Sequence, residues 1–192
     1  MILIVEGMDN CGKTTLIDNL RKKYFTRAKT IVHHSSSPPK DIKHPDLWES
    51  RHYDDLSYTF KELVRYHQYD VILDRFHLGA IVYGAKYRQS DGNLIRAIDK
   101  QHFTDNKESA LLLLTDTYEG IKSRDDGKSI EQTKEEFDDV RNRFIKAFEA
   151  SAVPNKLHIE IGTNTIDMVY QLVIEWLIHT ESYLDNDDRP SY

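Results

Sequence analysis

A glycine-bounded segment near the start of the chain has the composition and spacing of a phosphate-binding loop. Residues 7–14 read Gly-Met-Asp-Asn-Cys-Gly-Lys-Thr, which satisfies Gly-x4-Gly-Lys-Thr. In such a loop, successive backbone N–H groups point inward at phosphate oxygens, the lysine meets the β- and γ-phosphates, and the threonine hydroxyl can ligate Mg²⁺. A helix starting near Lys13 would add its positive end. We therefore predict nucleoside triphosphate binding by Gly7, Asn10, Cys11, Gly12, Lys13, Thr14 and Thr15, with Thr14 also a metal ligand.

The same segment could be a glycine turn that only joins a strand to a helix. The register of Lys13-Thr14 after an apolar run and before a helical pattern favours the binding interpretation. Cys11 lies inside the loop, where a helix N-terminus could lower its pKa and make it easy to alkylate. Because no partner for covalent catalysis stands nearby in the sequence, we interpret Cys11 as a small loop residue.

A regulatory GTPase would share this loop but needs further motifs. The nearest match to its guanine-reading Asn-Lys-x-Asp is Asn106-Lys107-Glu108-Ser109, which lacks the final acid. After the third apolar run, Asp74 is followed by Arg75-Phe76-His77 instead of the x-x-Gly of a switch segment. A GTP-driven switch is therefore a weak interpretation.

The elements that would position these residues alternate between strand and helix patterns. Short apolar runs predict strands at Ile2–Val5, Lys29–His34, Asp70–Asp74, Ala110–Thr115 and Leu157–Ile161. Helical spacing predicts helices at about Lys13–Tyr24, Asp46–His67, His77–Arg88, Asn93–Gln101, Thr117–Ser123, Lys134–Ala150 and Thr165–Leu184. The alternation predicts an α/β fold with a mostly parallel five-stranded sheet, helices on both faces, and ligands at the carboxyl ends of the strands. We expect a single domain over residues 1–184 and a frayed tail over 185–192.

Composition narrows the class of protein. The chain has 192 residues, a net charge of −6, 39% hydrophobic and 30% charged residues, and one cysteine. No basic face for a polynucleotide or an anionic membrane is indicated, and no internal disulfide can form. The longest apolar run, Ala110–Leu114, is far shorter than the roughly 20 residues of a membrane span. With no secretory signal after Met1, we expect a cytoplasmic protein.

Four segments, in order, resemble the thymidylate kinases. Residues 6–15 resemble that family's phosphate loop, Asp74-Arg75-Phe76 and the helix after it resemble its Asp-Arg-Tyr block, residues 119–132 resemble its lid, and residues 137–144 its post-lid helix. The match in order and spacing covers about Met1–Ile178. The resemblance implies a P-loop kinase that uses ATP and Mg²⁺ and acts on small nucleotide substrates. By the same analogy the protein would be a homodimer.

The resemblance also implies roles for individual residues. Asp9 would accept a hydrogen bond from the sugar 3′-hydroxyl of the acceptor. Asp74 would lie near Mg²⁺ or the acceptor phosphate, and Arg75 would clamp that phosphate. In-line phosphoryl transfer depends mainly on positioning and electrostatic stabilisation. Cations and a metal therefore suffice, and no nucleophilic side chain of the protein is required.

The acceptor side departs from the family pattern. No arginine occurs between Arg27 and Arg51, where the family has an Arg-Glu-Pro-type segment and this chain has His-His-Ser-Ser-Ser-Pro-Pro at 33–39. Tyr83 keeps an aromatic residue at its family position, whereas glycines at 79 and 84 replace polar residues and would enlarge the pocket. Candidates for contacting the base are Trp48, Arg51, Tyr58 and Phe60, although for each one taken singly an ordinary place in the core or on the helix surface is favoured.

A polar segment at about residues 124–133 is expected to act as a lid. It has little to bury and contains Gly127, so it should be mobile when empty and close over bound substrates. Some thymidylate kinases carry a catalytic arginine inside the phosphate loop, whereas residues 8–11 here include no cation. The resemblance therefore implies that Arg124, which matches the first lid arginine of that family, reaches the transferring phosphoryl group, and that Lys128 partly takes over the place of a second cation. The alternative is a solvated cover without a catalytic charge.

Three functions remain open. The first is transfer from ATP to a deoxynucleoside monophosphate, dTMP or a modified pyrimidine analogue. The second is a kinase of a hydroxyl on a nucleoside or polynucleotide, at a 5′ end or a hydroxymethylated base. The missing arginine and the enlarged pocket favour this alternative, but the net charge of −6 weighs against a polynucleotide. The third is a non-enzymatic nucleotide switch.

Overall fold

The computed structural model of the chain describes residues 1–26, 30–34, 44–64, 70–124 and 133–187. Within these ranges, no helix is both long and apolar enough to cross a membrane.

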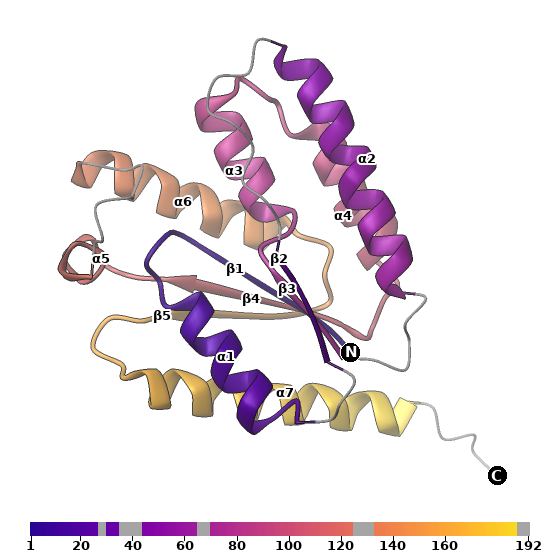
Figure 1. The fold of residues 1–192 in the computed structure, drawn as a ribbon, viewed down its shortest axis with the longest axis vertical. Coiled ribbons are helices and arrows are strands. Elements are labelled where there is room, and N and C mark those ends of the chain that lie inside the picture. Colours follow the sequence, from indigo (N-terminus) through magenta and orange to yellow (C-terminus); the bar gives the residue numbers. More distant parts are fainter. Residues whose placement is uncertain (27–29, 35–43, 65–69, 125–132, 188–192) are drawn as a thin grey trace.

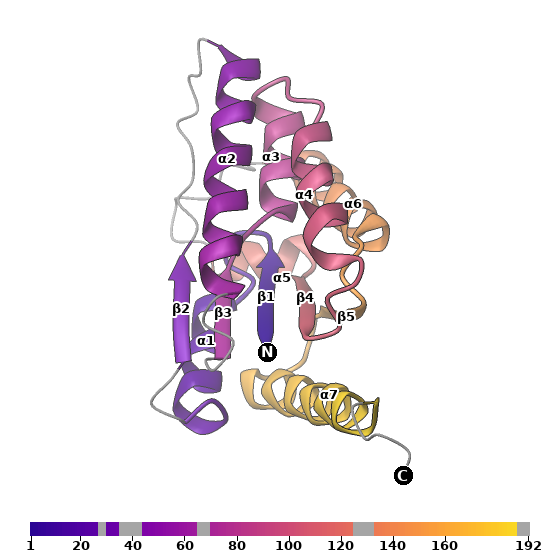
Figure 2. The ribbon, with the colours of Figure 1, turned by 90° about the vertical axis from the view of Figure 1, so that its right-hand side faces the viewer.

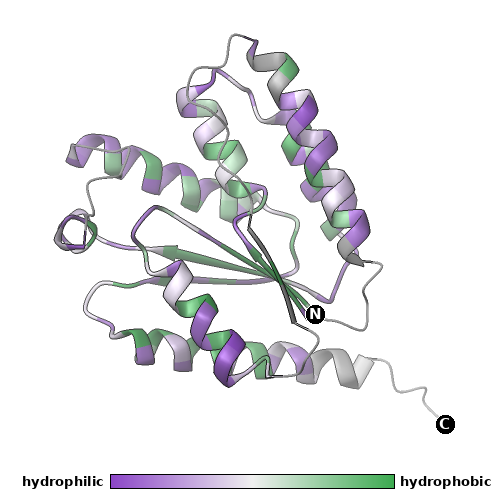
Figure 3. Ribbon diagram, viewed as in Figure 1, coloured by the Kyte–Doolittle hydropathy of each residue, from purple (hydrophilic) through white to green (hydrophobic). Residues whose placement is uncertain are grey.

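Five parallel strands form one sheet. They are β1 (Ile2–Gly7), β2 (Thr30–His34), β3 (Asp70–Asp74), β4 (Ser109–Thr115) and β5 (Asn155–Glu160), in the spatial order β2-β3-β1-β4-β5. Each neighbouring pair is parallel. β1 and β4 are buried along their whole length, which explains their continuous apolar sequence and their green colour in Figure 3. The predicted α/β class and strand number are confirmed.

Helices cover both faces of the sheet. They are α1 (Lys13–Lys23), α2 (Pro45–Val64), α3 (Leu78–Tyr87), α4 (Asn93–Phe103), α5 (Tyr118–Ser123), α6 (Lys134–Ala150) and α7 (Ile166–Asp187). Figures 1 and 2 show α1 and α7 on one face and α2, α3, α4 and α6 on the other. α7 continues through residues 185–187, the first three of the expected tail, before the described part of the chain ends.

The strand order determines where a ligand can bind. β1 lies at the centre of the sheet, α1 follows it on one face, and α3 follows the neighbouring β3 on the other face. At the carboxyl ends of the adjacent strands β1 and β3, the chain therefore turns to opposite faces of the sheet. Such a switch point leaves a crevice for ligands in parallel α/β sheets.

Candidate active site

The phosphate loop leaves β1 through a glycine that tolerates no side chain. Gly7 has a φ of 145°, and a Cβ atom there would lie 2.2 Å from the Leu114 carbonyl oxygen of β4. The loop then curls into α1, whose first residue is Lys13. The buried residues Leu16, Ile17 and Leu20 hold this helix against the core. The predicted strand, loop and helix are thus confirmed.

Lys13 is folded back into its own loop. Its Nζ donates to the carbonyl oxygen of Gly7 at 3.1 Å and to that of Met8. Burial, together with the positive charge of Arg75, lowers the pKa of Lys13 from 10.5 to about 8, although Cys11, Asp9 and Asp74 act in the opposite direction. The lysine is therefore poised between its charged and neutral forms just above neutral pH.

This lowered pKa predicts that triphosphate binding takes up a proton. Phosphate oxygens favour the charged amine and raise its pKa, so the free protein must gain a proton on binding wherever pH exceeds about 8. We expect the Kd for ATP to rise by up to about tenfold per pH unit above that value. Calorimetry in two buffers of different ionisation enthalpy would measure the uptake. A Kd that stays constant between pH 7 and pH 9.5 would contradict the prediction, and Lys13→Ala supplies the control without a titrating group.

Arg75 begins the turn between β3 and α3 in an unusual backbone conformation. Its φ is 64°, in the left-handed region that residues other than glycine rarely adopt. Its Nη1 donates to the Gly7 carbonyl oxygen at 3.0 Å, and its Nη2 forms an ion pair with Asp9. Burial opposes the charge on Arg75, but Tyr83, Asp9 and Glu6 outweigh it and leave its pKa raised. The guanidinium therefore stays charged beside the phosphate loop.

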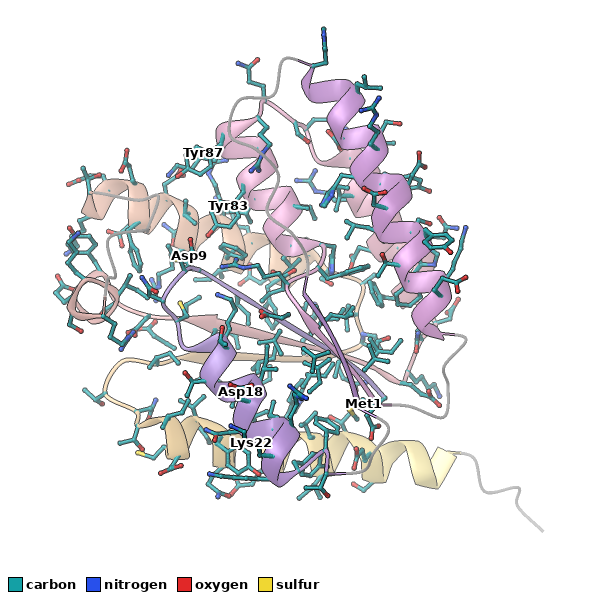
Figure 4. The ribbon with its side chains drawn as sticks, in the orientation of Figure 1. Met1, Asp9, Asp18, Lys22, Tyr83 and Tyr87 are labelled. Carbon is teal, nitrogen blue, oxygen red and sulfur yellow. The ribbon has the colours of Figure 1, made fainter. Side chains whose placement is uncertain are left out.

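Aromatic side chains of α3 flank this ion pair. Tyr83 and Tyr87 stack with ring centroids 6.2 Å apart, and Tyr83 is close enough to Arg75 to act on its pKa. Figure 4 draws Asp9 at the phosphate loop on the same side of the molecule as the two tyrosines. The structure thus groups three of the predicted acceptor residues, Asp9, Arg75 and Tyr83.

Arg124 is held at the opposite flank of the loop. Its Nη2 pairs with Asp116, and its Nε donates to the Asn10 carbonyl oxygen at 3.3 Å. Asp116 is fully buried after β4 and also accepts hydrogen bonds from the backbone N–H groups of Thr117, at 2.7 Å, and Gly162, at 3.1 Å. This carboxyl group therefore ties the start of the expected lid to the β5–α7 connection and aims Arg124 at the loop.

The chain resembles known proteins in its three-dimensional structure and not detectably in its sequence. No family model and no curated protein sequence matches the chain. Many solved structures do match it, and the following three are among them. The YorR protein of Bacillus subtilis, in complex with phosphorylated GDP, is 19% identical over 95% of this chain and 98% of its own, with a TM-score of 0.65. Thymidylate kinase from Candida albicans is 20% identical over 94% and 92%, with a TM-score of 0.60, and that from Ehrlichia chaffeensis is 17% identical over 92% and 98%, with a TM-score of 0.64.

The chain has the thymidylate kinase fold.

Within this thymidylate kinase fold, the base-contact candidates on α2 separate into core and surface. Phe60 is 4% exposed and packs against the rings of Phe76, His102 and Phe103, so its proposed contact with a base is replaced by a core role. Arg51 and Tyr58 are exposed. The side chain of Trp48 lies outside those that the structure describes.

The structure also describes the loop residue Cys11 but not most of the expected lid. Cys11 is 1% exposed, and burial raises the pKa of its thiol to about 11. The helix N-terminus does not lower this pKa, because a buried thiolate would lose its hydration, and Cys11 is a packed loop thiol, in keeping with its interpretation as a small loop residue. Lys128 and the rest of the expected lid at 125–132 lie outside the described residues, as do residues 35–39 of the acceptor side.

Two buried carboxyl groups, Asp116 and Glu6, escaped sequence reasoning. Each stands at or just after the carboxyl end of a buried central strand, next to the phosphate loop or the start of the lid. An acidic residue directly after a continuous apolar strand was the available signal, since such a group is buried only with partners.

Proposed function

We propose that this chain is a nucleoside monophosphate kinase. It transfers the γ-phosphoryl group of ATP to a deoxynucleoside monophosphate, dTMP or a modified pyrimidine analogue. The observation that carries the proposal is a shared acceptor: Lys13 Nζ and Arg75 Nη1 both donate to the Gly7 carbonyl oxygen, at 3.1 and 3.0 Å. Two cations this close together suit a donor phosphate and an acceptor phosphate that meet.

The reaction then depends on exchange of partners at these cations. The donor phosphates lie on the loop N–H groups at the start of α1, and Lys13 turns from its own carbonyl oxygens to the β- and γ-phosphates. The acceptor phosphate takes the place of Asp9 at the Arg75 guanidinium, which leaves Asp9 to accept from the acceptor sugar. Arg124 lies across the loop and adds charge at the transferring group. Bringing two anionic phosphates together is the main barrier that these groups lower.

The residues present suit Mg²⁺ held mostly by phosphates. Among the described residues, no group of three or more His, Cys, Asp or Glu could hold a metal ion by itself. Mg²⁺ commonly uses one or two protein ligands with substrate phosphates and water. The exposed Thr14 hydroxyl at the start of α1 and the half-buried Asp74, whose charge acts on Lys13, would be those ligands. When bound, Mg²⁺ neutralises phosphate charge.

A panel assay tests this proposal against the hydroxyl kinase. ATP with Mg²⁺ is offered to deoxynucleosides, their monophosphates, ribonucleoside monophosphates and short oligonucleotides with free 5′ hydroxyls or hydroxymethylated bases. We expect a diphosphate product from a pyrimidine deoxynucleoside monophosphate. Turnover only of nucleosides or oligonucleotides would replace the proposal by a hydroxyl kinase, and nucleotide binding without transfer to any acceptor would indicate a switch.

Asp9→Ala is expected to weaken binding of the acceptor but not binding of ATP. The variant loses the hydrogen bond to the sugar, at a cost of about tenfold in the KM for the acceptor, and discriminates ribose from deoxyribose less. The KM for ATP should change little. Asp18→Ala is the control, because Asp18 is an exposed carboxylate on α1, away from the loop (Figure 4). A loss confined to ATP affinity would place Asp9 with the donor and contradict its assigned role.

A further inference from the structure

Arg75 has a left-handed backbone conformation beside the phosphate loop, and hydrogen bonds from the residues that follow it fix the turn. We propose that the buried carboxyl group of Glu6 is the positioning residue for Arg75, acting through the backbone of the β3–α3 turn and not by contact with a nucleotide. This inference rests on the proposed function, in which Arg75 receives the acceptor phosphate.

The contacts of Glu6 converge on that turn. Glu6 is fully buried and is the last residue of β1 before Gly7. Its Oε1 accepts from the N–H groups of Phe76 at 2.8 Å and Leu78 at 2.9 Å, and its Oε2 accepts from that of Gly79 at 3.3 Å. A single carboxyl group thus receives three backbone donors at the start of α3, which is the favourable end of a helix for negative charge.

Arg75 is secured on both sides by consecutive residues of β1. Its own N–H donates to the Val5 carbonyl oxygen at 3.0 Å, and the next N–H, that of Phe76, donates to Glu6. A residue other than glycine stays at a φ of 64° only where the surroundings over-determine it. Removing the carboxyl group would leave three buried N–H groups without their acceptor, so the turn would relax and the guanidinium would lose its fixed aim.

Gly79 lies next to this carboxyl group. A Cβ atom at position 79 would lie 3.4 Å from Glu6 Oε2 and 4.0 Å from the Tyr83 ring. The glycine that sequence reasoning assigned to a larger acceptor pocket therefore faces Glu6, and a polar side chain there would compete with the Gly79 N–H for the same oxygen.

Glu6 also links the two halves of the site. β1 continues from Glu6 into the phosphate loop, whose Gly7 carbonyl oxygen accepts from both Lys13 and Arg75. The carboxyl group that fixes the acceptor clamp is thereby adjacent to the donor loop. A separate buried contact, between His77 Nε2 and Asp99 at 2.9 Å, holds the start of α3 to α4 but reaches neither Arg75 nor the loop.

Glu49 offers a matched control for a variant of Glu6. Its carboxyl group is 6% exposed, accepts from the Leu94 N–H at 3.3 Å at the start of α4, and accepts from the Ser90 hydroxyl. It is thus another buried acidic cap, on a helix that does not carry Arg75. Glu6→Gln and Glu49→Gln each exchange one carboxyl oxygen for an amide at a buried helix start.

The experiment compares steady-state kinetics of these variants with the best acceptor of the panel. We expect Glu6→Gln to raise the KM for the acceptor about tenfold and Glu6→Ala about a hundredfold, with the KM for ATP within about twofold of wild type. Glu6→Gln should therefore retain part of the acceptor affinity that Glu6→Ala loses. Glu49→Gln should lower thermal stability comparably and leave both KM values near those of wild type.

A double-mutant cycle with Arg75→Ala decides whether Glu6 acts through Arg75. In the Arg75→Ala background, Glu6→Gln should add no further loss of acceptor affinity, because the residue that it positions is gone. A full additional loss in that background, or equal effects of Glu6→Gln and Glu49→Gln on the acceptor KM, would overturn the inference.

Amide hydrogen exchange separates failure of this inference from failure of the proposed function. If wild type turns over no acceptor in the panel, the proposed function fails, but exchange at Phe76, Leu78 and Gly79 still tests the carboxyl cap. We expect these three amides to exchange faster in Glu6→Gln and to keep wild-type rates in Glu49→Gln. Unchanged exchange in Glu6→Gln would overturn the inference whatever the activity.

Discussion

Lys13→Ala should lower kcat by on the order of 10²-fold or more while leaving the fold nearly intact. The loss reflects removal of the charge that follows the transferring phosphoryl group, on the scale of losing one electrostatic stabiliser. The fold should survive, because Leu16, Ile17 and Leu20 anchor α1 and do not depend on the amine. Steady-state kinetics of the panel's best acceptor, with a thermal melt of each protein, measure both effects.

Lys22→Ala is the control for this variant. Lys22 is exposed in the last turn of the same helix, far from the loop (Figure 4), so its loss changes the net charge by the same amount without touching phosphate. It should keep full activity. If Lys13→Ala retained near-full ATP-dependent activity, the assignment of residues 7–14 as the donor phosphate site would be overturned.

Arg124→Ala should lower kcat by about 10²- to 10⁴-fold, in the lower part of the range for an arginine that stabilises phosphoryl transfer. The side chain is already held at the loop by Asp116 and the Asn10 carbonyl oxygen, so little ordering is required when substrates bind. Its KM values should change less than kcat, because the charge matters most in the transition state. Lys128→Ala should cost about tenfold, since an ammonium lacks the planar fork of a guanidinium.

Arg143→Ala is the matched control for Arg124→Ala. The two side chains are similarly exposed, at 43% and 42%, and each pairs with an aspartate, but Arg143 pairs with Asp139 on the outer surface of α6. It should leave kcat unchanged. If Arg124→Ala kept the wild-type kcat, the lid would cover the site without supplying a catalytic charge. A raised KM for ATP at unchanged kcat would place Arg124 against the base or sugar of the donor.

The local pattern of the chain predicted most of the site on the donor side. The spacing of Gly7, Gly12 and Lys13 specified a loop whose function resides in backbone N–H groups, so it could be identified without knowing the rest of the fold. Asp74-Arg75 was found because, at the end of an apolar strand, it resembles the Asp-Arg-Tyr block of the thymidylate kinases. These predictions could be made because their determinants are close in sequence.

Partners that are distant in sequence came only from the tertiary structure. Phe60 had the right type for a base contact, yet packing against Phe76 and Phe103 placed it in the core. The acidity of Cys11 depended on how deeply the loop is buried, which a helix N-terminus alone does not reveal.

Glu6 and Asp116 show the same division most clearly. From sequence each is an acid beside an apolar strand, with no partner in view. Parallel β1, β3 and β4 bring the turn after residue 74 to Glu6, and bring Gly162 and Arg124 to Asp116. The sequence by itself determined the alternation of strands and helices and the phosphate loop. Sheet topology decided which buried charge meets which donor, because the free energy that permits a buried carboxyl group comes from neighbours on other strands.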